Sequence, residues 1–190
     1  MEKIKITVPL DDTQSQSLRA GDAVLISGVI YTARDAAHKR LVELLKAGKP
    51  LPCNLAGQII YYVGPSPAKP GAVIGSAGPT TSYRMDSYTP MLLDEAGLRG
   101  MIGKGLRSDT VKSAIVRNKG VYFAAIGGAA ALLASTVKTC TLIAYPELES
   151  EAIYRLEVVD FPAVVVLDCH GGDLYKTGRA EYLASVSGAR

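Results

Sequence analysis

The chain has 190 residues, of which 48% are hydrophobic and 21% are charged, and its formal net charge is +3. This length is sufficient for one domain with a buried core. The basic residues are scattered, without a basic block or interleaved aromatic residues, which argues against nucleic-acid binding. The N-terminal residues do not resemble a secretion signal, and the longest uncharged run, residues 121–137, is slightly short for a membrane span. We therefore expect a cytoplasmic protein that does not bind membranes.

The first third of the chain predicts strands that alternate with a helix. Apolar and polar residues alternate over residues 4–8, which predicts a half-exposed strand, and residues 11–17 follow as a polar connector. A short apolar run bounded by glycines predicts a buried strand over residues 23–28. Apolar residues on one helical face then predict a helix over residues 33–47, which ends at a glycine and a proline. Another strand is expected over residues 58–63.

The middle of the chain continues this alternation. A brief strand is expected over residues 72–74, before a Gly-Pro-Thr-Thr turn. A threonine followed by proline is the start signature of the helix expected over residues 89–97, and residues 99–103 predict a short strand. A Ser-Asp pair caps the helix expected over residues 108–120. Residues 121–126 predict a further strand.

The last third is richer in strands. A helix of small residues after Gly127-Gly128 leads to strands expected over residues 139–144, 153–159 and 163–168, with a break at Pro162 between the last two. Strands alternating with helices imply a partly parallel sheet, whereas the strand-rich end implies an additional antiparallel layer. Since the chain contains no internal repeat and no low-complexity linker, we predict one α/β domain over residues 1–190.

Residues 78–86 are the most informative stretch, because Thr80, Thr81, Ser82 and Arg84 directly follow a glycine-proline break. Backbone N–H groups of such a turn can converge on an anion, and hydroxyls and a guanidinium add further donors. Helix capping and a surface ion pair are the alternative interpretation. However, one helix cap requires fewer hydroxyls than are present here.

Two further cations have similar surroundings. Arg34 lies at the start of a predicted helix, beyond a predicted strand, where α/β sheets bind their ligands. Asp35 complements the helix dipole, and His38 is more typical of a packed or solvated histidine than of a catalytic one. Lys104 lies between two glycines and is either an anion ligand or an exposed lysine of a turn. Together, these cations predict a pocket for a small polyanion.

Several other classes of site are excluded by the sequence. A nucleotide P-loop would require glycine at Leu98 and serine or threonine at Gly105. No dinucleotide fingerprint, catalytic triad or convincing carboxylate pair is present. The spacing of Cys53, Cys140 and Cys169 fits neither a disulfide framework nor a metal centre built by this chain alone. The predicted anion pocket therefore corresponds to half of an active site.

Two blocks in combination point to a family. The Arg-Asp-x-x-His block at residues 34–38 and the Gly-Pro-Thr-Thr-Ser-x-Arg-Met-Asp block at residues 78–86 resemble the beta subunit, or C-terminal domain, of class I iron–sulfur fumarate hydratases and tartrate dehydratases. The resemblance covers nearly the whole chain, and it includes residues 21–28, 58–65, 100–105 and 157–163. It implies a swivelling β/β/α fold of three layers and the reversible addition of water to a C4 dicarboxylate.

The resemblance also implies a cofactor and roles for individual residues. A 4Fe–4S cluster is implied in the partner, held by three cysteines of the alpha subunit or N-terminal domain. Arg34, Arg84 and Lys104 would bind substrate carboxylates, and Thr80 would remove the proton beside a carboxylate. A threonine hydroxyl is a poor base, so this role requires nearby cations or a proton acceptor. The residues implied to support this site, with helix capping and turn bonding as the alternative, are Asp35, His38, Thr81 and Asp86.

The sequence leaves the substrate and the assembly open. Malate, dehydrated to fumarate, and tartrate, dehydrated to oxaloacetate, are both C4 dicarboxylates. We expect a heterotetramer with two copies of each subunit, because most assemblies have twofold symmetry, and a homodimer is an alternative for the isolated chain. A stand-alone binding module for an organic di-acid or phosphate, or a purely structural domain, would also account for the pattern.

Overall fold

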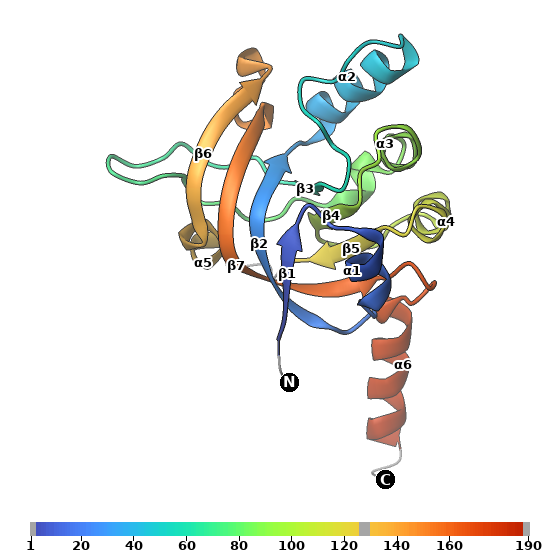
Figure 1. Ribbon diagram of the computed structural model, residues 1–190. Helices are drawn as coiled ribbons and strands as arrows, with labels where there is room; N and C mark the ends of the chain where they lie inside the picture. Colours follow the sequence, from blue (N-terminus) through green and yellow to red (C-terminus); the bar gives the residue numbers. More distant parts are fainter. Residues whose placement is uncertain (1–2, 126–129, 188–190) are drawn as a thin grey trace.

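The computed structural model describes residues 3–125 and 130–187. Within these ranges seven strands form one mixed sheet in the order β1-β2-β3-β4-β5-β7-β6 (Figure 1). The strands are β1 (Ile4–Val8), β2 (Ala23–Thr32), β3 (Ile59–Tyr61), β4 (Gly100–Gly103), β5 (Val121–Ala124), β6 (Val137–Ala144) and β7 (Ile153–Leu167).

The first five strands run parallel to one another, and β7 is antiparallel to β2, β5 and β6. Because β7 pairs with both β5 and β2, the strands β2, β3, β4, β5 and β7 close into a ring. The predicted α/β class, with a partly parallel sheet and added antiparallel strands, is confirmed. The antiparallel strands belong to the same curved sheet as the parallel ones.

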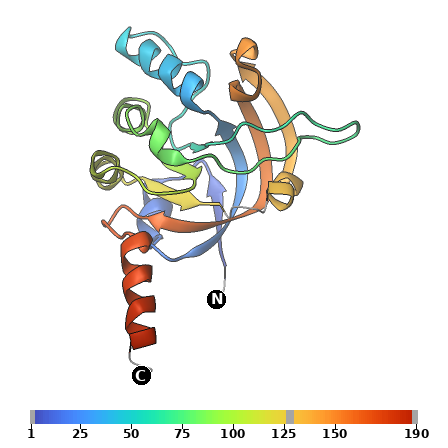
Figure 2. The ribbon, with the colours of Figure 1, turned by 180° about the vertical axis from the view of Figure 1, so that it is seen from behind.

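The helices are α1 (Asp12–Ser17), α2 (Asp35–Lys46), α3 (Thr89–Glu95), α4 (Asp109–Arg117), α5 (Ala130–Ser135) and α6 (Leu174–Ser187), with 3₁₀ turns η1 (Ser82–Met85) and η2 (Pro146–Glu151). In Figure 1, β6, β7 and β2 lie on the left, β3, β4 and β5 in the middle, and α2, α3 and α4 on the right; Figure 2 shows the same order from behind. The arrangement is a three-layer β/β/α fold.

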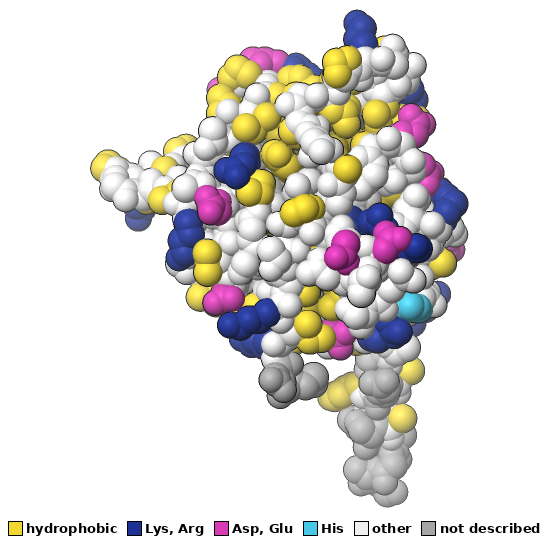
Figure 3. All heavy atoms as spheres, viewed as in Figure 1, with side chains coloured by type: hydrophobic (Ala, Val, Ile, Leu, Met, Phe, Trp, Pro, Cys, Tyr) yellow, Lys and Arg dark blue, Asp and Glu magenta, His cyan; other side chains and the backbone are white. Residues whose placement is uncertain are grey.

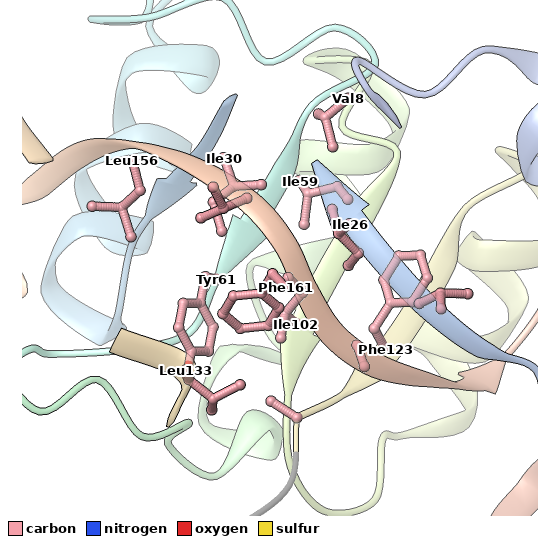
Figure 4. Close-up of a cluster of buried hydrophobic side chains, with 14 of the residues drawn as sticks. Val8, Ile26, Ile30, Ile59, Tyr61, Ile102, Phe123, Leu133, Leu156 and Phe161 are labelled. Atoms are coloured by element: carbon pink, nitrogen blue, oxygen red, sulfur yellow. The ribbon is translucent and has the colours of Figure 1, made fainter. Parts of the chain in front are cut away.

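The alternation of side chains along β3 separates two hydrophobic cores. Ile59 and Tyr61 belong to the core between the two layers of strands (Figure 4), whereas Ile60 and Tyr62 belong to the core beneath the helices. The middle strands are therefore apolar on both faces, which explains why the sequence shows them as short continuous apolar runs.

The polar connector predicted for residues 11–17 is wrong, because α1 occupies most of it. The Asp11 carboxylate accepts a hydrogen bond from the Gln14 N–H at 2.7 Å, and the Gln14 side-chain oxygen lies 3.4 Å from the Asp11 N–H. This reciprocal capping box stabilises the first turn of a short helix. All six residues of α1 are polar, so the sequence shows no apolar face with helical spacing from which this helix could be predicted.

The strand predicted for residues 72–74 is also wrong. These residues lie in the long loop after β3, which extends away from the sheet in Figures 1 and 2. The Ser66 N–H donates to the Ser76 carbonyl at 3.0 Å, and the Ser76 N–H donates to the Ser66 hydroxyl at 2.8 Å. The loop thus folds back on itself, and its backbone groups bond within the loop rather than to a strand of the sheet.

The break predicted at Pro162 does not occur, since β7 continues through it. β6 pairs with β7 up to Val158, and β5 pairs with it from Val164 onward, so Pro162 lies where β2 is the neighbouring strand. A proline is tolerated at a position that lacks a second neighbour, because no partner there requires its missing N–H. Helix α6, which projects from the body at the C-terminal end (Figure 1), was not predicted from the sequence.

The surface agrees with the scattered charge of the sequence. On the face shown in Figure 3, lysine and arginine side chains are interspersed with aspartate and glutamate. Within residues 3–125 and 130–187, none of the helices combines the length and the apolar character that a membrane crossing requires.

Candidate functional site

Three parallel strands end side by side at one edge of the sheet. Arg34 follows β2, and Lys104 follows β4. Between them, the chain continues beyond β3 to Tyr62, whose carbonyl accepts a hydrogen bond from the Thr80 N–H at 2.8 Å. The fold thus brings Arg34, Thr80 and Lys104 to the same edge, where α/β proteins bind their ligands.

The Arg34 side chain is held by groups from separate segments. Arg34 is the N-cap residue of α2, and its Nη2 lies 3.3 Å from Oε1 of Glu151. The other carboxylate oxygen of Glu151 accepts a hydrogen bond from the Ala36 N–H at 3.2 Å. On another side, a Cβ placed on Gly64 would lie 2.8 Å from Nη1 of Arg34. A glycine is therefore needed at position 64 for the guanidinium to occupy this place.

Asp35 links the two predicted arginines. Nε of Arg84 donates a hydrogen bond to Oδ1 of Asp35 at 2.8 Å, and Oδ2 of Asp35 lies 4.0 Å from Nε of Arg34. Oδ2 of Asp35 and Nε of Arg34 are both buried without a hydrogen-bond partner among the described residues. Two cations that are fifty positions apart in the sequence therefore lie on either side of one carboxylate.

The segment that contains the hydroxyls is joined to the segment that contains Lys104. Thr81 and Lys104 form an isolated parallel bridge, and the Ser82 N–H donates to the Lys104 carbonyl at 2.9 Å. The Lys104 N–H donates in turn to the Ser82 hydroxyl at 3.1 Å. The Lys104 side chain is exposed, so its ammonium group is accessible at this edge.

Asp86 has a structural partner rather than a free carboxylate. Its Oδ1 accepts a hydrogen bond from Nε of Arg107 at 2.6 Å, and its Oδ2 accepts one from the Ser108 N–H at 2.6 Å. The Arg107 side chain is completely buried, donates to the Thr89 hydroxyl at 2.8 Å, and lies 5.3 Å from the centre of the Tyr62 ring. Asp86 thus anchors the end of η1 to the start of α4.

His38 is packed inside the protein. Its Nδ1 lies 2.9 Å from the Arg34 carbonyl, and its ring meets the Tyr62 ring edge-on with 5.2 Å between the centroids. Burial lowers the pKa of His38 to about 4, so the imidazole is neutral at physiological pH. The side chain supports the N-terminal turn of α2 from within the core.

The three cysteines are free; Cys140 lies on β6, and Cys53 and Cys169 lie in two separate loops. Burial raises the pKa of the Cys53 thiol to about 11 and also raises that of Cys140 and Cys169 above the ordinary value. In the part of the chain that the structure describes, no group of three or more histidine, cysteine, aspartate or glutamate side chains could hold a metal ion.

The lining of a hollow of about 580 Å³ includes Pro65 and Ser150, which adjoin Gly64 and Glu151 in the sequence. The hollow is bordered by the projecting loop after β3 and by the β6–β7 hairpin, including Ile74, Cys140 and Tyr154. None of the predicted site residues lines it. The candidate site is therefore an open edge rather than the interior of this hollow.

Residues 1–178 of the chain match the Fumarase C-terminus family. The chain belongs to this family. Fumarate hydratase 2 of Leishmania major is 39% identical over 176 residues, which cover 91% of this chain. The anaerobic class I fumarate hydratase of Escherichia coli is 44% identical over 152 residues, which cover 80% of it.

Members of the fumarase C-terminus family differ in how much of a protein this domain represents. The chain spans 31% of the Leishmania enzyme and 28% of the Escherichia coli enzyme, which is less than a third of each. A protein of Methanocaldococcus jannaschii, named as an L(+)-tartrate dehydratase beta subunit, is 39% identical over 166 residues, and the match covers 85% of both chains. The same domain thus occurs within long chains and as a protein of similar length.

In this fumarase C-terminus domain, sequence reasoning missed two charged residues that contact the predicted ones. Glu151 holds Arg34 from 117 positions away, and no local pattern could have revealed this contact. Arg107 carries no signal in the sequence, yet it is buried and donates to Asp86 and to Thr89. Charges that are separated in the chain become neighbours only in the folded structure.

Proposed function

We propose that this chain is the beta subunit of an iron–sulfur-dependent hydro-lyase, which reversibly removes water from a C4 hydroxy-dicarboxylate such as malate. Arg34, Arg84 and Lys104 bind the substrate carboxylates, and Thr80 removes the proton. The observation that carries the proposal is the convergence of these four residues at one sheet edge, where Asp35 lies between the two arginines. The relatives named as fumarate hydratases support the reaction class.

The arginines remain able to bind a carboxylate although acidic groups face them. Asp35 accepts a hydrogen bond from Nε of Arg84, whereas a carboxylate ligand can be bound end-on by the two Nη groups. The Arg84 side chain is 42% exposed, so this end of the guanidinium is accessible. Asp35 thus orients Arg84 without occupying its Nη groups, whereas Glu151 already pairs with Nη2 of Arg34.

The chemistry of this chain is charge stabilisation and proton transfer. Removing a proton from the carbon beside a carboxylate adds a second negative charge to that group. Guanidinium and ammonium groups already in place stabilise this charge in the transition state. The same cations favour an alkoxide at Thr80, which a threonine requires to act as a base. The hydrogen bond from the Thr80 N–H to the Tyr62 carbonyl fixes the backbone that presents this hydroxyl.

The residues of this chain do not fit an iron–sulfur cluster. Its three cysteines are free, lie in separate segments, and belong to no metal-binding group in the described ranges. The proposal therefore assigns the 4Fe–4S cluster to a separate alpha subunit or N-terminal domain, which pairs with this chain. We expect two copies of each subunit in the assembly.

Reconstitution tests the proposal. The purified chain, mixed anaerobically with its cluster-bearing partner, should interconvert malate and fumarate, and the chain alone should not. Arg84→Ala should lower kcat/KM by about 10²- to 10³-fold, as the loss of one preorganised charge donor does. Arg117→Ala is the control, because Arg117 is an exposed arginine paired with Asp94 on α3. Full activity of the Arg84→Ala assembly would contradict the carboxylate-binding role.

Tartrate is the second candidate substrate, because the tartrate dehydratase beta subunit matches this chain over most of both lengths. Assays of the same assembly with malate and with L-tartrate distinguish the two. A non-catalytic dicarboxylate-binding module would instead bind a di-acid in calorimetry and give no turnover with any partner.

A further inference from the structure

Ser82 lies between the backbone near Thr80 and the backbone of Lys104. Its side chain is fully buried, and its hydroxyl oxygen accepts a hydrogen bond from the Lys104 N–H at 3.1 Å and lies 2.9 Å from the Tyr122 hydroxyl oxygen. The Ser82 N–H donates to the Lys104 carbonyl at 2.9 Å. The N–H and the carbonyl of Lys104 are thus both bonded to one residue.

The turn that follows Lys104 is held by two tyrosines. The Tyr122 hydroxyl also lies 2.9 Å from the Gly105 carbonyl, and the Gly105 N–H donates to the Tyr175 hydroxyl at 3.2 Å. Gly103 precedes Lys104, and a Cβ built on it would overlap the Ser82 hydroxyl oxygen. Side chains from η1, β5 and α6 therefore converge on one turn, and the contact with Ser82 requires glycine at position 103.

We propose that Ser82 is a positioning residue, which determines where Lys104 lies relative to Thr80. This inference rests on the proposed function, in which Lys104 binds a carboxylate and Thr80 removes the neighbouring proton. The carboxylate and the reacting C–H are adjacent in such a substrate. The separation of the two protein groups therefore decides whether the bound substrate presents its proton to the hydroxyl. A misplacement of about 1 Å can cost roughly 100-fold in rate.

A double-mutant cycle in the assembled enzyme separates this role from a general structural one. Ser82→Ala alone should lower kcat/KM by roughly 10- to 100-fold. In a Lys104→Ala background the same change should cost less than about twofold, because the group that Ser82 positions is already absent. Ser87→Ala, an exposed serine in the same segment, is the control and should keep full activity. Equal losses in both backgrounds would overturn the proposal.

A second variant and a second measurement keep the proposal testable if Ser82→Ala folds poorly. Tyr122→Phe retains the buried ring and removes only the hydroxyl. It should lower kcat/KM in the wild-type background, and it should have little effect on kcat/KM in the Lys104→Ala background. Amide hydrogen exchange in the isolated chain tests the contact without any assay of activity. Exchange of the Lys104 amide should be at least about tenfold faster in Ser82→Ala than in wild type or Ser87→Ala.

The two measurements fail in different ways. Unchanged exchange at Lys104 would overturn the positioning role whatever the activity of the assembly. If Lys104 exchanged faster in Ser82→Ala but the wild-type assembly turned over neither malate nor tartrate, the proposed function would be overturned. The catalytic role of the contact between Ser82 and Lys104 would then be overturned as well.

Discussion

The Glu151 carboxylate joins the Arg34 guanidinium to the backbone of the first turn of α2. One of its oxygens lies 3.3 Å from Nη2 of Arg34, and the other accepts a hydrogen bond from the Ala36 N–H at 3.2 Å. Glu151 is the last residue of η2, which precedes β7. A residue just before the antiparallel strand β7 therefore orients a side chain just after the parallel strand β2.

Glu151→Ala should raise KM for the dicarboxylate in the assembled enzyme, because Arg34 loses the group that orients it. We expect about tenfold, which corresponds to about 1.4 kcal/mol. Glu151→Gln should have a smaller effect, since the amide oxygen can still accept from Ala36 and from Arg34. The exposed Glu149 provides the control Glu149→Ala. Steady-state kinetics in which all three variants behave alike would show that Glu151 does not orient Arg34.

His38 should make folding stability depend on pH between about 6.5 and about 4. Burial lowers the pKa of His38 in the folded chain to about 4, whereas its ordinary value is 6.5. Over this interval the unfolded chain binds a proton that the folded chain does not, so stability falls as the pH falls. The loss is on the order of 3 kcal/mol when the pH is below both values.

Urea unfolding at several pH values measures this dependence. His38→Gln should unfold with a shallower dependence over the same interval, because its side chain does not titrate. His170→Gln removes the exposed histidine and is the matched control for the loss of an imidazole. If His38→Gln retained the full dependence, other groups would account for it.

Arg107→Ala should destabilise the fold strongly. It leaves the Asp86 carboxylate without its ion pair and also removes the donor to Thr89 and the cation beside the rings of Tyr62 and Tyr122. Loss of one partner of a buried ion pair costs roughly 3–5 kcal/mol.

The matched control for Arg107→Ala is Arg117→Ala. Arg117 also pairs with an aspartate, Asp94, but both side chains are substantially exposed. An exposed pair is worth about 0–1 kcal/mol. Thermal or urea unfolding of the two variants gives the comparison, and losses of similar size would show that burial does not decide the strength of these pairs.

Gly103→Ala should destabilise the chain through overpacking, because the new methyl group would overlap the Ser82 hydroxyl. Such overpacking typically costs roughly 1–3 kcal/mol. Ser82→Gly should be less harmful in the Gly103→Ala chain than in wild type, since it removes the clashing atom. A double mutant that loses as much free energy of unfolding as the two single mutants lose together would rule out this steric explanation.

Elements with strong local signals could be predicted from the sequence. The Ser108-Asp109 pair predicts the start of α4, where the Ser108 hydroxyl accepts a capping hydrogen bond from the Val111 N–H, and Thr89-Pro90 predicts the start of α3. α1 and α6 lacked a clear apolar stripe and were missed. The strand break predicted at Pro162 was wrong because the effect of a proline depends on whether a second strand lies beside it, which is not a local property.

The candidate site shows the same division. The density of hydroxyls behind the turn in residues 78–86 indicated Thr80, Ser82 and Arg84 as candidate site residues. Their neighbours could not be identified, because the contact of Arg84 with Asp35 and that of Ser82 with Lys104 each join separate segments. The proposed roles of these residues stay predictions until the variants are measured.

The amino-acid sequence by itself determined the α/β class and most of the strands, and it singled out the candidate site residues, because caps, turns and apolar runs act over a few neighbouring positions. Only the tertiary structure decided that Glu151 faces Arg34, that His38 and Arg107 are buried, and that Ser82 is bonded to Lys104. The contact of Glu151 with Arg34 follows from the β2–β7 pairing, and that of Ser82 with Lys104 joins segments that follow the paired strands β3 and β4. Burial and charge pairing arise from such pairings between distant segments, and no short stretch of sequence contains them.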